Sequence, residues 1–295
     1  MALSIHTNYS SLVTQTNLTK TNNALSTNQQ RLGTGLRVNS AADDAAGLQI
    51  AVRLNSQSRG MEVAIRNTGD SISLLQTAEG AFNEMTDILQ RMKDLATQGA
   101  NGTNSTDDLD SLQSEYDQLG EELANIMDNT SFAGEALFSK DNSAGKFAAA
   151  VDFQIGATSA ETMTLDLTAA GTDAIQTLTD ALDGMSTVYT AGSAATAGTE
   201  LTGAANATID LVKTALDAVG TLRSQFGATI NRLNHTANNL ANMKDNTDMS
   251  KGRIMDADFA QESANMSKNS MLMQSGISML KQAGQMPGMV MSLLG

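Results

Sequence analysis

Apolar side chains recur at alternating intervals of three and four residues over three long stretches of this sequence. That spacing aligns apolar side chains along one side of an α-helix, where they can pack against a second helix. The pattern therefore predicts three long helices, each with a buried stripe. The stripe residues are Leu75, Ala78, Phe82, Met85, Leu89, Met92, Ala96 and Gly99 in the first, Leu109, Leu112, Tyr116, Leu119, Leu123 and Ile126 in the second, and Ile209, Val212, Leu216, Val219, Arg223, Phe226, Ile230, Leu233, Ala237 and Leu240 in the third.

Polar and glycine residues indicate where the helices begin and end. The segment Gly99–Asp107 is rich in Gly and Asn, which permit left-handed turns, and Ser105 with Asp108 resembles a capping box for the next helix. Because this loop is short, we expect its two helices to run antiparallel. Farther upstream, Ser40–Asp44 offers a hydroxyl as a cap and two acids for a first turn, so a long helix is predicted from there towards Gly99.

Residues 141–204 follow a different pattern. Phe153–Ile155 and Met163–Leu167 alternate in the manner of strands around Gly156–Glu161, which predicts a β-hairpin. The stretch Ala169–Ala207 is rich in Ala, Thr, Gly and Ser, with one possible helix over Asp173–Val188, and we expect it to be an insertion lying mostly at the surface. The predicted fold class is mainly α, a long antiparallel coiled-coil helical bundle with a small β-hairpin and a short variable insertion.

Both ends of the chain carry thin apolar stripes with a seven-residue spacing. Their companion positions are mostly Thr, Asn, Ser or Gly. Fixing about 40 backbone residues costs roughly 1 to 2 kcal/mol each, whereas burying four such side chains returns roughly 1.5 to 3 kcal/mol each. We infer that the two ends become ordered only when their stripes meet each other and those of neighbouring chains. The stripe residues are Leu18, Leu25, Leu32, Phe259, Met266, Met273 and Leu280.

Composition narrows the classes of function. The 295 residues are 41% hydrophobic but only 3% aromatic, and they include no Trp and no Cys, which excludes disulfides, Cys zinc sites and thiol nucleophiles. The net charge of −14 disfavours nucleic acid and anionic membrane surfaces as partners. Because no apolar run approaches the roughly 18 to 20 residues that span a bilayer, we expect no membrane insertion. The N-terminus also lacks the pattern of a cleavable secretion signal.

Residues that suggest chemistry have simpler explanations. His6 and His235 lack the His-Glu-x-x-His context of a zinc site, and we expect His235 to be a half-exposed helical residue. Gly33-Thr-Gly35 lacks the remainder of a phosphate-binding loop, and we interpret it as a flexible joint. The acid pairs Asp43–Asp44 and Asp107–Asp108 fall at predicted helix starts, where capping explains them. We therefore expect no catalytic residues, no metal and no cofactors.

Sequence motifs near both ends of the chain carry a family resemblance. Ala24–Gly47 (ALSTNQQRLGTGLRVNSAADDAAG) resembles the segment that links the innermost and second domains of bacterial flagellins, the subunits of the flagellar filament. Ser250–Ala260 (SKGRIMDADFA), Ser263–Ser267 (SANMS) and Val290–Leu294 (VMSLL) resemble its C-terminal signature. The resemblance implies an inner tube domain (1–40 plus 250–295), a rod-like helical core domain (41–140 plus 205–249) and a hairpin with a variable surface insertion (141–204).

The resemblance also implies a non-enzymatic function, partners and a location. The chain would be exported unfolded through the flagellar type III apparatus without a cleavable signal peptide. It would then polymerise with itself, as an extracellular filament that drives swimming, beneath a distal cap and next to the hook-filament junction proteins. A cytoplasmic export chaperone would hold the C-terminal helix, about Phe259–Leu294 here. The end of the chain is rich in Met, where other residues are more usual in the family. These methionines would change the lining of the filament lumen or the fit of this chaperone.

A further resemblance concerns recognition by a vertebrate host. The segments Leu89–Ala96 (LQRMKDLA) and Leu112–Glu115 (LQSE) are similar to the surface read by the vertebrate flagellin-sensing Toll-like receptor. Lys93 and Asp94 stand where Arg and Glu are usual, which keeps the charge but changes its reach. The implied contact residues are Arg91, Leu95 and Glu115.

Three alternatives remain open from the sequence. A junction or adaptor protein of the same organelle would share the terminal heptads, although Arg31–Gly47 and Ser250–Ser267 resemble flagellin more closely. An enzyme on a helical scaffold would need a constellation of reactive residues that the sequence does not offer. A cytosolic coiled-coil scaffold outside this organelle would also fit the heptads.

Overall fold

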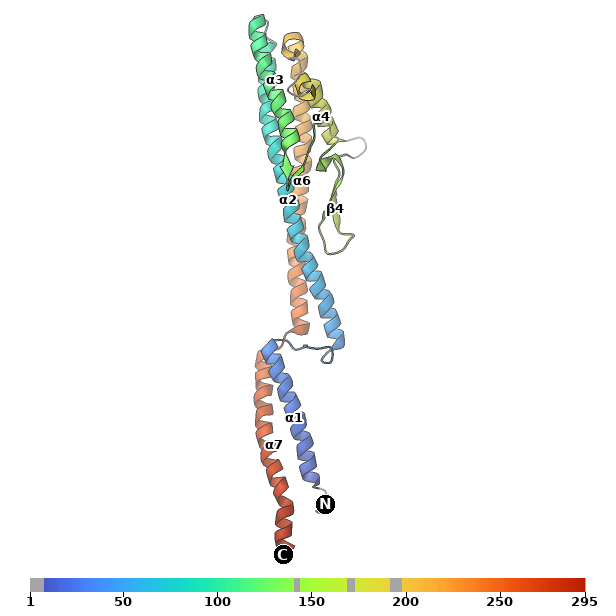
Figure 1. Ribbon diagram of the computed structural model, residues 1–295, viewed down its shortest axis with the longest axis vertical. Helices are drawn as coiled ribbons and strands as arrows, with labels where there is room; N and C mark the ends of the chain where they lie inside the picture. The colour runs from blue at the N-terminus through green and yellow to red at the C-terminus, as the bar shows by residue number, and fades with distance from the viewer. Residues whose placement is uncertain (1–7, 141–143, 169–172, 192–197, 295) are drawn as a thin grey trace. The chain divides into compact units, whose positions relative to one another are not determined.

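The computed structural model describes residues 8–140, 144–168, 173–191 and 198–294. Its helices and strands appear along the chain in Figure 1. The helices are α1 (Tyr9–Thr34), α2 (Ala45–Gly99), α3 (Thr106–Asn129), the 3-10 helix η1 (Lys146–Ala148), α4 (Ala174–Met185), α5 (Thr187–Ala191), α6 (Glu200–Met255) and α7 (Phe259–Leu294). The strands are β1 (Ser131–Phe132), β2 (Glu135–Ala136), β3 (Val151–Gln154) and β4 (Thr162–Leu165). The predicted mainly α fold with long helices is confirmed.

The chain divides into two compact units. Unit 1 comprises the residues up to Ser58 and those from Asp245 onward, and unit 2 comprises Arg59–Lys244. The divisions fall within α2 and α6, so each of these helices contributes to both units. This partition differs from the three domains that the sequence led us to expect, and those domains stay a prediction.

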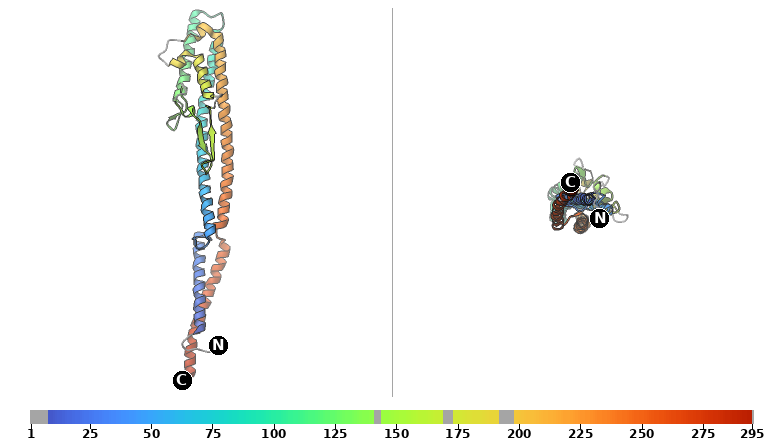
Figure 2. Two further views of the ribbon diagram at one scale, coloured as in Figure 1. Left: turned by 90° about the vertical axis from the view of Figure 1, so that its right-hand side faces the viewer. Right: turned by 90° about the horizontal axis from the view of Figure 1, so that it is seen from below.

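In unit 1, α1 and α7 lie side by side, as both Figure 1 and Figure 2 show. Asn8 caps the start of α1 by accepting a hydrogen bond from the Ser11 backbone N–H at 3.1 Å. Gly35 ends the helix in the left-handed conformation, with φ at 73° and its N–H donated to the Arg31 carbonyl. Gly33 lies inside α1, so Gly33-Thr-Gly35 forms the end of a helix in the structure.

The start of α2 requires a correction. Helix α2 begins at Ala45, and its cap is Asp44, whose carboxylate accepts from the Gly47 N–H at 2.8 Å. Ser40, which the sequence suggested as the cap, instead lies in a turn that is closed by Asp43. The Asp43 carboxylate accepts from the backbone N–H groups of Ser40 and Asn39, and these bonds lower the pKa of Asp43. Because Asp44 directly precedes the first helical residue, it takes the capping position, and the Ser40 hydroxyl instead donates to the Asp43 carboxylate at 3.1 Å.

Helices α2, α3 and α6 supply most of the core of unit 2. The predicted α2 stripe from Leu75 to Ala96 is fully buried, and Gly99 is half-buried. In α3 and α6 one row of each predicted stripe is buried, apart from half-buried Leu109, while beside most positions of the other row the buried residue lies one position away. Met127 is buried beside half-buried Ile126, and Leu222 is buried beside half-buried Arg223. Arg223 keeps partial access to water, which its charge favours, and Leu222 takes the place in the core.

Four phenylalanines gather at the centre of this core despite the low aromatic content. Phe82 of α2 packs on Phe226 of α6 with ring centroids 5.6 Å apart, and on Phe138 at 4.9 Å. Phe147 completes the cluster by contacting both Phe138 and Phe226. The segment that follows α3 is thereby fixed to the helices, since offset and tilted aromatic pairs add to the area they bury.

Two small antiparallel hairpins lie in unit 2. The predicted hairpin is confirmed as β3 and β4, in which Phe153 pairs with Met163 and both side chains are buried. The second hairpin, β1 with β2, turns through Ala133 and Gly134, which both have positive φ. This hairpin was not predicted, although a glycine between two short segments is a known turn signal.

The expectation that Ala169–Ala207 lies mostly at the surface is wrong for its described part. Helix α4 carries an apolar face that packs into the core of unit 2, and α5 contacts α3. The helix predicted over Asp173–Val188 is present but divided, because α4 ends at Met185 and α5 begins at Thr187. The buried side chains in this stretch are Ala174, Ile175, Leu178, Thr179, Leu182, Met185, Ser186, Val188, Tyr189, Leu201 and Ala205.

Candidate functional site

The α1–α7 pair of unit 1 carries the stripe residues predicted for the chain ends. Six of them are half-buried, namely Leu18, Leu25, Leu32, Met266, Met273 and Leu280. Phe259 is 58% exposed, so it lies at the margin of the seam. Leu18 packs closely against α7, because a Cβ atom added to Gly276 would lie 3.1 Å from Leu18 Cδ1. The seam between the two helices is therefore real but shallow.

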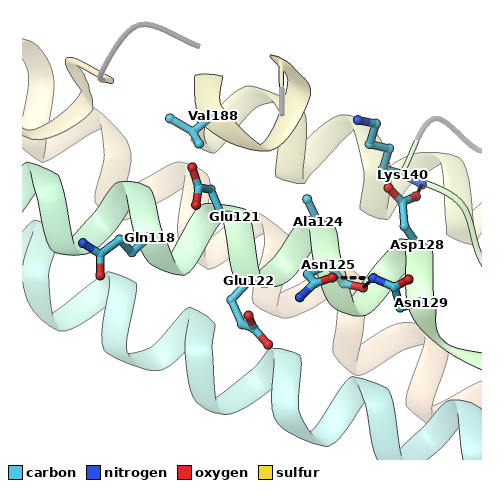
Figure 3. A pocket seen from close by; sticks show the side chains of 9 residues that line it. All are labelled: Gln118, Glu121, Glu122, Ala124, Asn125, Asp128, Asn129, Lys140 and Val188. Atoms are coloured by element: carbon cyan, nitrogen blue, oxygen red, sulfur yellow. Dashed lines mark hydrogen bonds between the residues drawn. The ribbon is translucent and has the colours of Figure 1, made fainter. Parts of the chain in front are cut away.

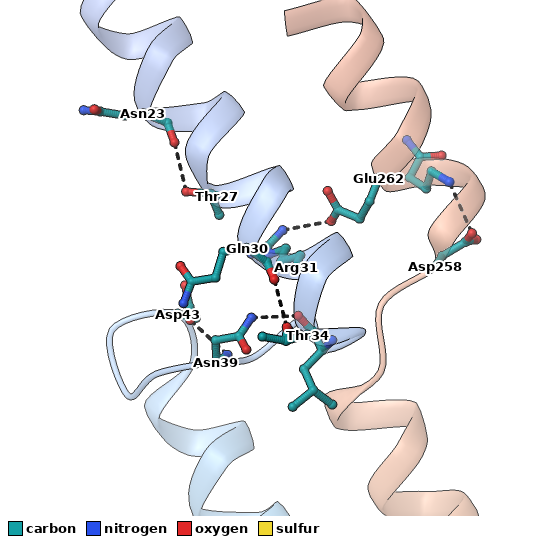
Figure 4. Close-up of polar contacts among 11 residues, drawn as sticks. Asn23, Thr27, Gln30, Arg31, Thr34, Asn39, Asp43, Asp258 and Glu262 are labelled. Carbon is teal, nitrogen blue, oxygen red and sulfur yellow. Dashed lines mark hydrogen bonds and ion pairs between the residues drawn. The ribbon is translucent and has the colours of Figure 1, made fainter. Parts of the chain in front are cut away.

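Polar contacts fix the register of this pair. Arg31 on α1 forms an ion pair with Glu262 on α7, with Nη1 and Oε1 3.1 Å apart, and the Glu262 residue is 8% exposed (Figure 4). Asn8 Nδ2 donates to the Ala283 carbonyl at 2.6 Å near the opposite end of α1. The structure describes every residue of α1, and the one that is buried is Asn28. A polar side chain in an apolar seam sets the alignment of two helices at some cost in stability.

The contacts of Asn28, Arg31 and Glu262 were not predicted from the sequence. The amide of Asn28 satisfies both of its ends when its nitrogen faces the Ala24 carbonyl at 2.6 Å and its oxygen faces the Met266 N–H at 3.2 Å. A signal existed, because Asn28 falls between Leu25 and Leu32 in the alternation of three and four residues. Because its side chain is polar, Asn28 is not a member of the predicted apolar stripe.

The segments that connect α1 to α2 and α6 to α7 are joined by backbone hydrogen bonds. Leu36 and Asp256 form an isolated antiparallel bridge, flanked by Arg37 N–H donating to Met255 O at 2.6 Å. The N–H of Ala257 donates to the Gly35 carbonyl at 2.9 Å. Asp258 then caps α7, accepting from the N–H groups of Ala260 and Gln261 (Figure 4). These bonds hold the ends of both helices together.

Large apolar side chains remain exposed over the α1–α7 pair. A groove between the helices is lined by Val13 and Leu18 of α1 and by Leu272, Gly276 and Met279 of α7, together with small polar residues. Scattered apolar side chains are ordinary on a protein surface, but a concentration on two paired helices indicates an interaction site. The exposed members are Tyr9, Leu12, Val13, Phe259, Met271, Leu272, Ile277 and Met279.

The candidate receptor-contact residues lie on α2 and α3 of unit 2. Arg91 and Glu115 form an ion pair across the two helices, with Arg91 Nη2 and Glu115 Oε1 2.6 Å apart and the side chains 53% and 44% exposed. Leu95, by contrast, is buried in the core with 1% of its surface exposed. The structure thus brings Arg91 and Glu115 together at the surface and places Leu95 in the core, where it is not accessible to a partner.

A buried polar cluster in unit 2 was not foreseen. Gln113 of α3 donates to Asp117 and to Glu200, each at 2.7 Å, and accepts from the Leu201 N–H at 2.7 Å. The Glu200 carboxylate also accepts from the backbone and hydroxyl of Thr187. These bonds anchor the starts of α5 and α6 to α3. They satisfy buried polar groups, which is a structural role.

A polar hollow beside α3 offers no catalytic arrangement. It is lined by Glu121, Glu122 and Asp128, with Lys140 at its edge (Figure 3). Carboxylates beside a lysine at an open surface are solvated charges. Within residues 8–140, 144–168, 173–191 and 198–294, no three His, Asp or Glu side chains gather as a metal site.

The remaining residues that suggested chemistry have structural positions. Ser105 and Asp108 form the predicted capping box of α3, which confirms that interpretation. His235 lies on a helix as predicted, but it is exposed on α6 and not half-exposed, and His6 lies outside the described residues. In the part of the chain that the structure describes, no helix is both long and apolar enough to cross a bilayer.

Comparisons with known proteins identify similar chains. The family model for the bacterial flagellin N-terminal helical region matches residues 5–143, and that for the C-terminal helical region matches residues 209–294. Flagellin A of Vibrio cholerae is 35% identical and flagellin A of Vibrio anguillarum 36% identical, in both cases over all of this chain and all of the relative. The fold also resembles that of a proposed flagellar hook-associated protein from Vibrio parahaemolyticus, with a TM-score of 0.56, 14% identity, and coverage of 72% of this chain and 100% of the other.

Proposed function

This chain belongs to the bacterial flagellin family, and from that premise we propose that its α1–α7 surface is where copies of the chain pack together. The chain is a structural subunit of the bacterial flagellar filament, the helical propeller for swimming, and it polymerises with itself. Flagellins are a structural protein family. The likeness to the hook-associated protein supports the fold alone, so the alternative of a junction protein gains no support from it.

The observation that carries the proposal is the apolar surface that α1 and α7 leave exposed after they have packed against each other. Helices α1 and α7 use their half-buried stripes to contact each other, and still present Leu12, Leu272 and Ile277 to solvent. The pair also carries few charges, since Lys20 and Arg31 are the charged residues of α1, and α7 has Glu262, Lys268 and Lys281. A surface of this kind can pack against copies of itself without strong repulsion, although the whole chain is acidic.

The test replaces Leu272, which is 49% exposed, by Asp or by Met. Leu272→Asp places a charge in the proposed contact and should prevent elongation of filament seeds, because burying an unpaired carboxylate is unfavourable. Leu272→Met keeps an apolar side chain of similar volume and should polymerise like the original chain. Far-ultraviolet circular dichroism would establish that both monomers retain their helices. Elongation by the Asp variant at the original rate would contradict the proposal.

The organisation into domains and the terminal stripe contacts are part of this proposal. Residues 1–40 and 250–295 would line an inner tube, residues 41–140 and 205–249 would surround it, and residues 141–204 would lie farther out. The stripe residues Leu18, Leu25, Leu32, Phe259, Met266, Met273 and Leu280 would complete their burial between copies. The filament cap and the hook-filament junction proteins would contact the same terminal helices at the two ends of the polymer.

The proposed route to the outside is export through the flagellar type III apparatus, without removal of a signal peptide. A cytoplasmic export chaperone would cover α7 beforehand, because its exposed apolar residues favour aggregation in a free subunit. Titration calorimetry of the purified chaperone with the full chain and with an Ile277→Ser variant tests this step. Equal affinities for the two chains would argue against chaperone contact at this part of α7.

Receptor recognition is proposed at the Arg91–Glu115 pair. Both side chains are accessible, whereas buried Leu95 supports the helices on which they lie. Arg91→Ala should reduce activation of cells that express the vertebrate flagellin-sensing receptor, and Arg91→Lys should reduce it less, because Lys keeps the charge but loses the bidentate geometry. Full activation by the Ala variant would exclude this contact.

A further inference from the structure

The methionines with described side chains differ widely in exposure. Those in the core of unit 2 are at most 6% exposed, and they are Met61, Met85, Met92, Met127, Met163 and Met185. On α7, by contrast, Met271 is 65% exposed and Met279 is 59% exposed. The chain therefore holds one set of thioethers protected by the core and another open to solvent.

The two exposed thioethers of α7 lie within the proposed self-association surface. Met271 neighbours exposed Leu272, and Met279 lines the groove between α1 and α7. Exposed apolar side chains and small polar residues alternate on this surface, so each sulfur would lose its contact with water once copies pack together. Thioethers suit such a contact because their flexible chains adapt to irregular shapes.

We propose that Met271 and Met279 make polymerisation sensitive to oxidation by hydrogen peroxide. The thioether sulfur attacks one peroxide oxygen, an S–O bond forms, the O–O bond breaks, and the second oxygen leaves as water after proton transfer. The sulfur loses two electrons and the peroxide gains them. This inference rests on the proposed function, since it concerns the same surface.

The expected consequence follows from the polarity of the product. A sulfoxide is polar and chiral, and in the contact between copies it would replace a flexible apolar thioether. We expect each oxidised site to slow the elongation of filament seeds by about tenfold, because a polar oxygen would be withdrawn from water at a contact that fits a thioether. The core methionines of unit 2 should react later, because peroxide reaches their sulfur atoms only when the core opens.

The experiment compares three chains before and after treatment of the monomer with hydrogen peroxide. These are the original chain, the double variant Met271→Leu/Met279→Leu, and the control Met249→Leu, which alters a 56% exposed methionine on α6. Peptide mass mapping locates the sulfoxides, and seeded elongation measures polymerisation. Methionine sulfoxide reductases repair the treated chain in a final step.

The inference predicts that the treated original chain and the Met249→Leu control both lose elongation, that the double variant keeps it, and that the reductases restore it. It is overturned if the treated original chain elongates seeds normally, if the double variant loses elongation equally, or if Met85 or Met92 is oxidised before Met271 and Met279. Failure of the untreated original chain to elongate seeds would overturn the proposed function instead. The mass mapping needs only the original chain, so the test does not depend on how a variant folds.

Discussion

The carboxylate of Asp108 makes the stability of helix α3 depend on pH. It accepts hydrogen bonds from the Ser105 N–H at 3.0 Å and from the Ser105 hydroxyl at 2.6 Å. Both bonds favour the ionised form and hold the pKa of Asp108 below its ordinary value of 3.8. A group whose pKa is lower in the folded state stabilises the fold above the unfolded-state pKa, and that contribution is lost as the pH falls through the folded-state value.

Asp108→Asn should therefore be less stable than the original chain at pH 7, and the difference should shrink as the pH falls below 3.8. Urea unfolding at a series of pH values measures this difference. Asp110→Asn removes an equal charge from the same helix outside the capping box and is the matched control. A difference between Asp108→Asn and the original chain that stays constant down to pH 2 would contradict the capping role.

Gly145 is a residue whose backbone excludes a side chain. Its φ is 129°, and an added Cβ atom would lie 3.0 Å from both the Leu137 carbonyl oxygen and the Phe138 carbonyl carbon. Gly145→Ala should destabilise unit 2 by about 1 to 3 kcal/mol, because the strain falls on backbone atoms that cannot move aside. Gly102→Ala, where an added Cβ atom meets nothing within 4 Å, is the control. Equal urea midpoints for the two variants would refute this account.

At the scale of helices and strands, the sequence predicted which segments form helices better than which face of each helix is buried. The heptads located α2, α3 and α6, since 3-4 spacing reflects the helical period itself. In α3 and α6 they placed half of the buried side chains one residue away from their actual positions. The reason is that an alternation of three and four residues describes a helix that packs against a single partner. Helix α3 also packs against α5, so its buried face is wider and includes Gln113 and Gly120. The buried position of α4 was missed, since a short apolar face in an Ala- and Thr-rich stretch resembles a loop.

The terminal helices show a similar limit for the candidate site. The seven-residue spacing found Leu18, Leu25 and Leu32, which lie in the α1–α7 seam. It could not find Glu262, whose partner Arg31 is 231 positions away in the sequence and becomes adjacent only when the two ends meet. Contacts of this kind depend on the pairing of distant helices, which local spacing does not encode.

A proline in either terminal helix tests whether filament assembly requires α1 and α7 to be helical. Leu25→Pro and Met273→Pro each remove a helical hydrogen bond and introduce a clash, at a cost of about 3 kcal/mol or more. Cells that produce either variant should lose swimming and long filaments, as judged by motility agar and electron microscopy. Leu25→Ala keeps the helix and removes part of one contact, so it should impair filaments less. Normal swimming and full-length filaments with both proline variants would contradict this role.

At the scale of the whole chain, the two units differ in how much core supports them. Unit 2 holds the large apolar cluster that includes Phe82, Phe226 and Leu123. In unit 1 the buried side chain of α1 is the polar Asn28, and the described part of α7 buries Glu262 and Ala283. Segments with few buried apolar contacts open at low free-energy cost. The ends of a free subunit should thus open far more often than residues 59–244.

Limited proteolysis of the free subunit follows this difference directly. A broad-specificity protease should cut the chain ends quickly and leave a resistant fragment of about residues 60 to 240, identified by mass spectrometry, because cleavage follows the population of locally open chain. The same protease should cut the ends slowly in assembled filaments, since neighbouring copies would cover the apolar surface of α1 and α7. Equal resistance along the whole free chain would mean that the α1–α7 seam suffices for order, and contacts between copies would then not be needed to hold the terminal helices.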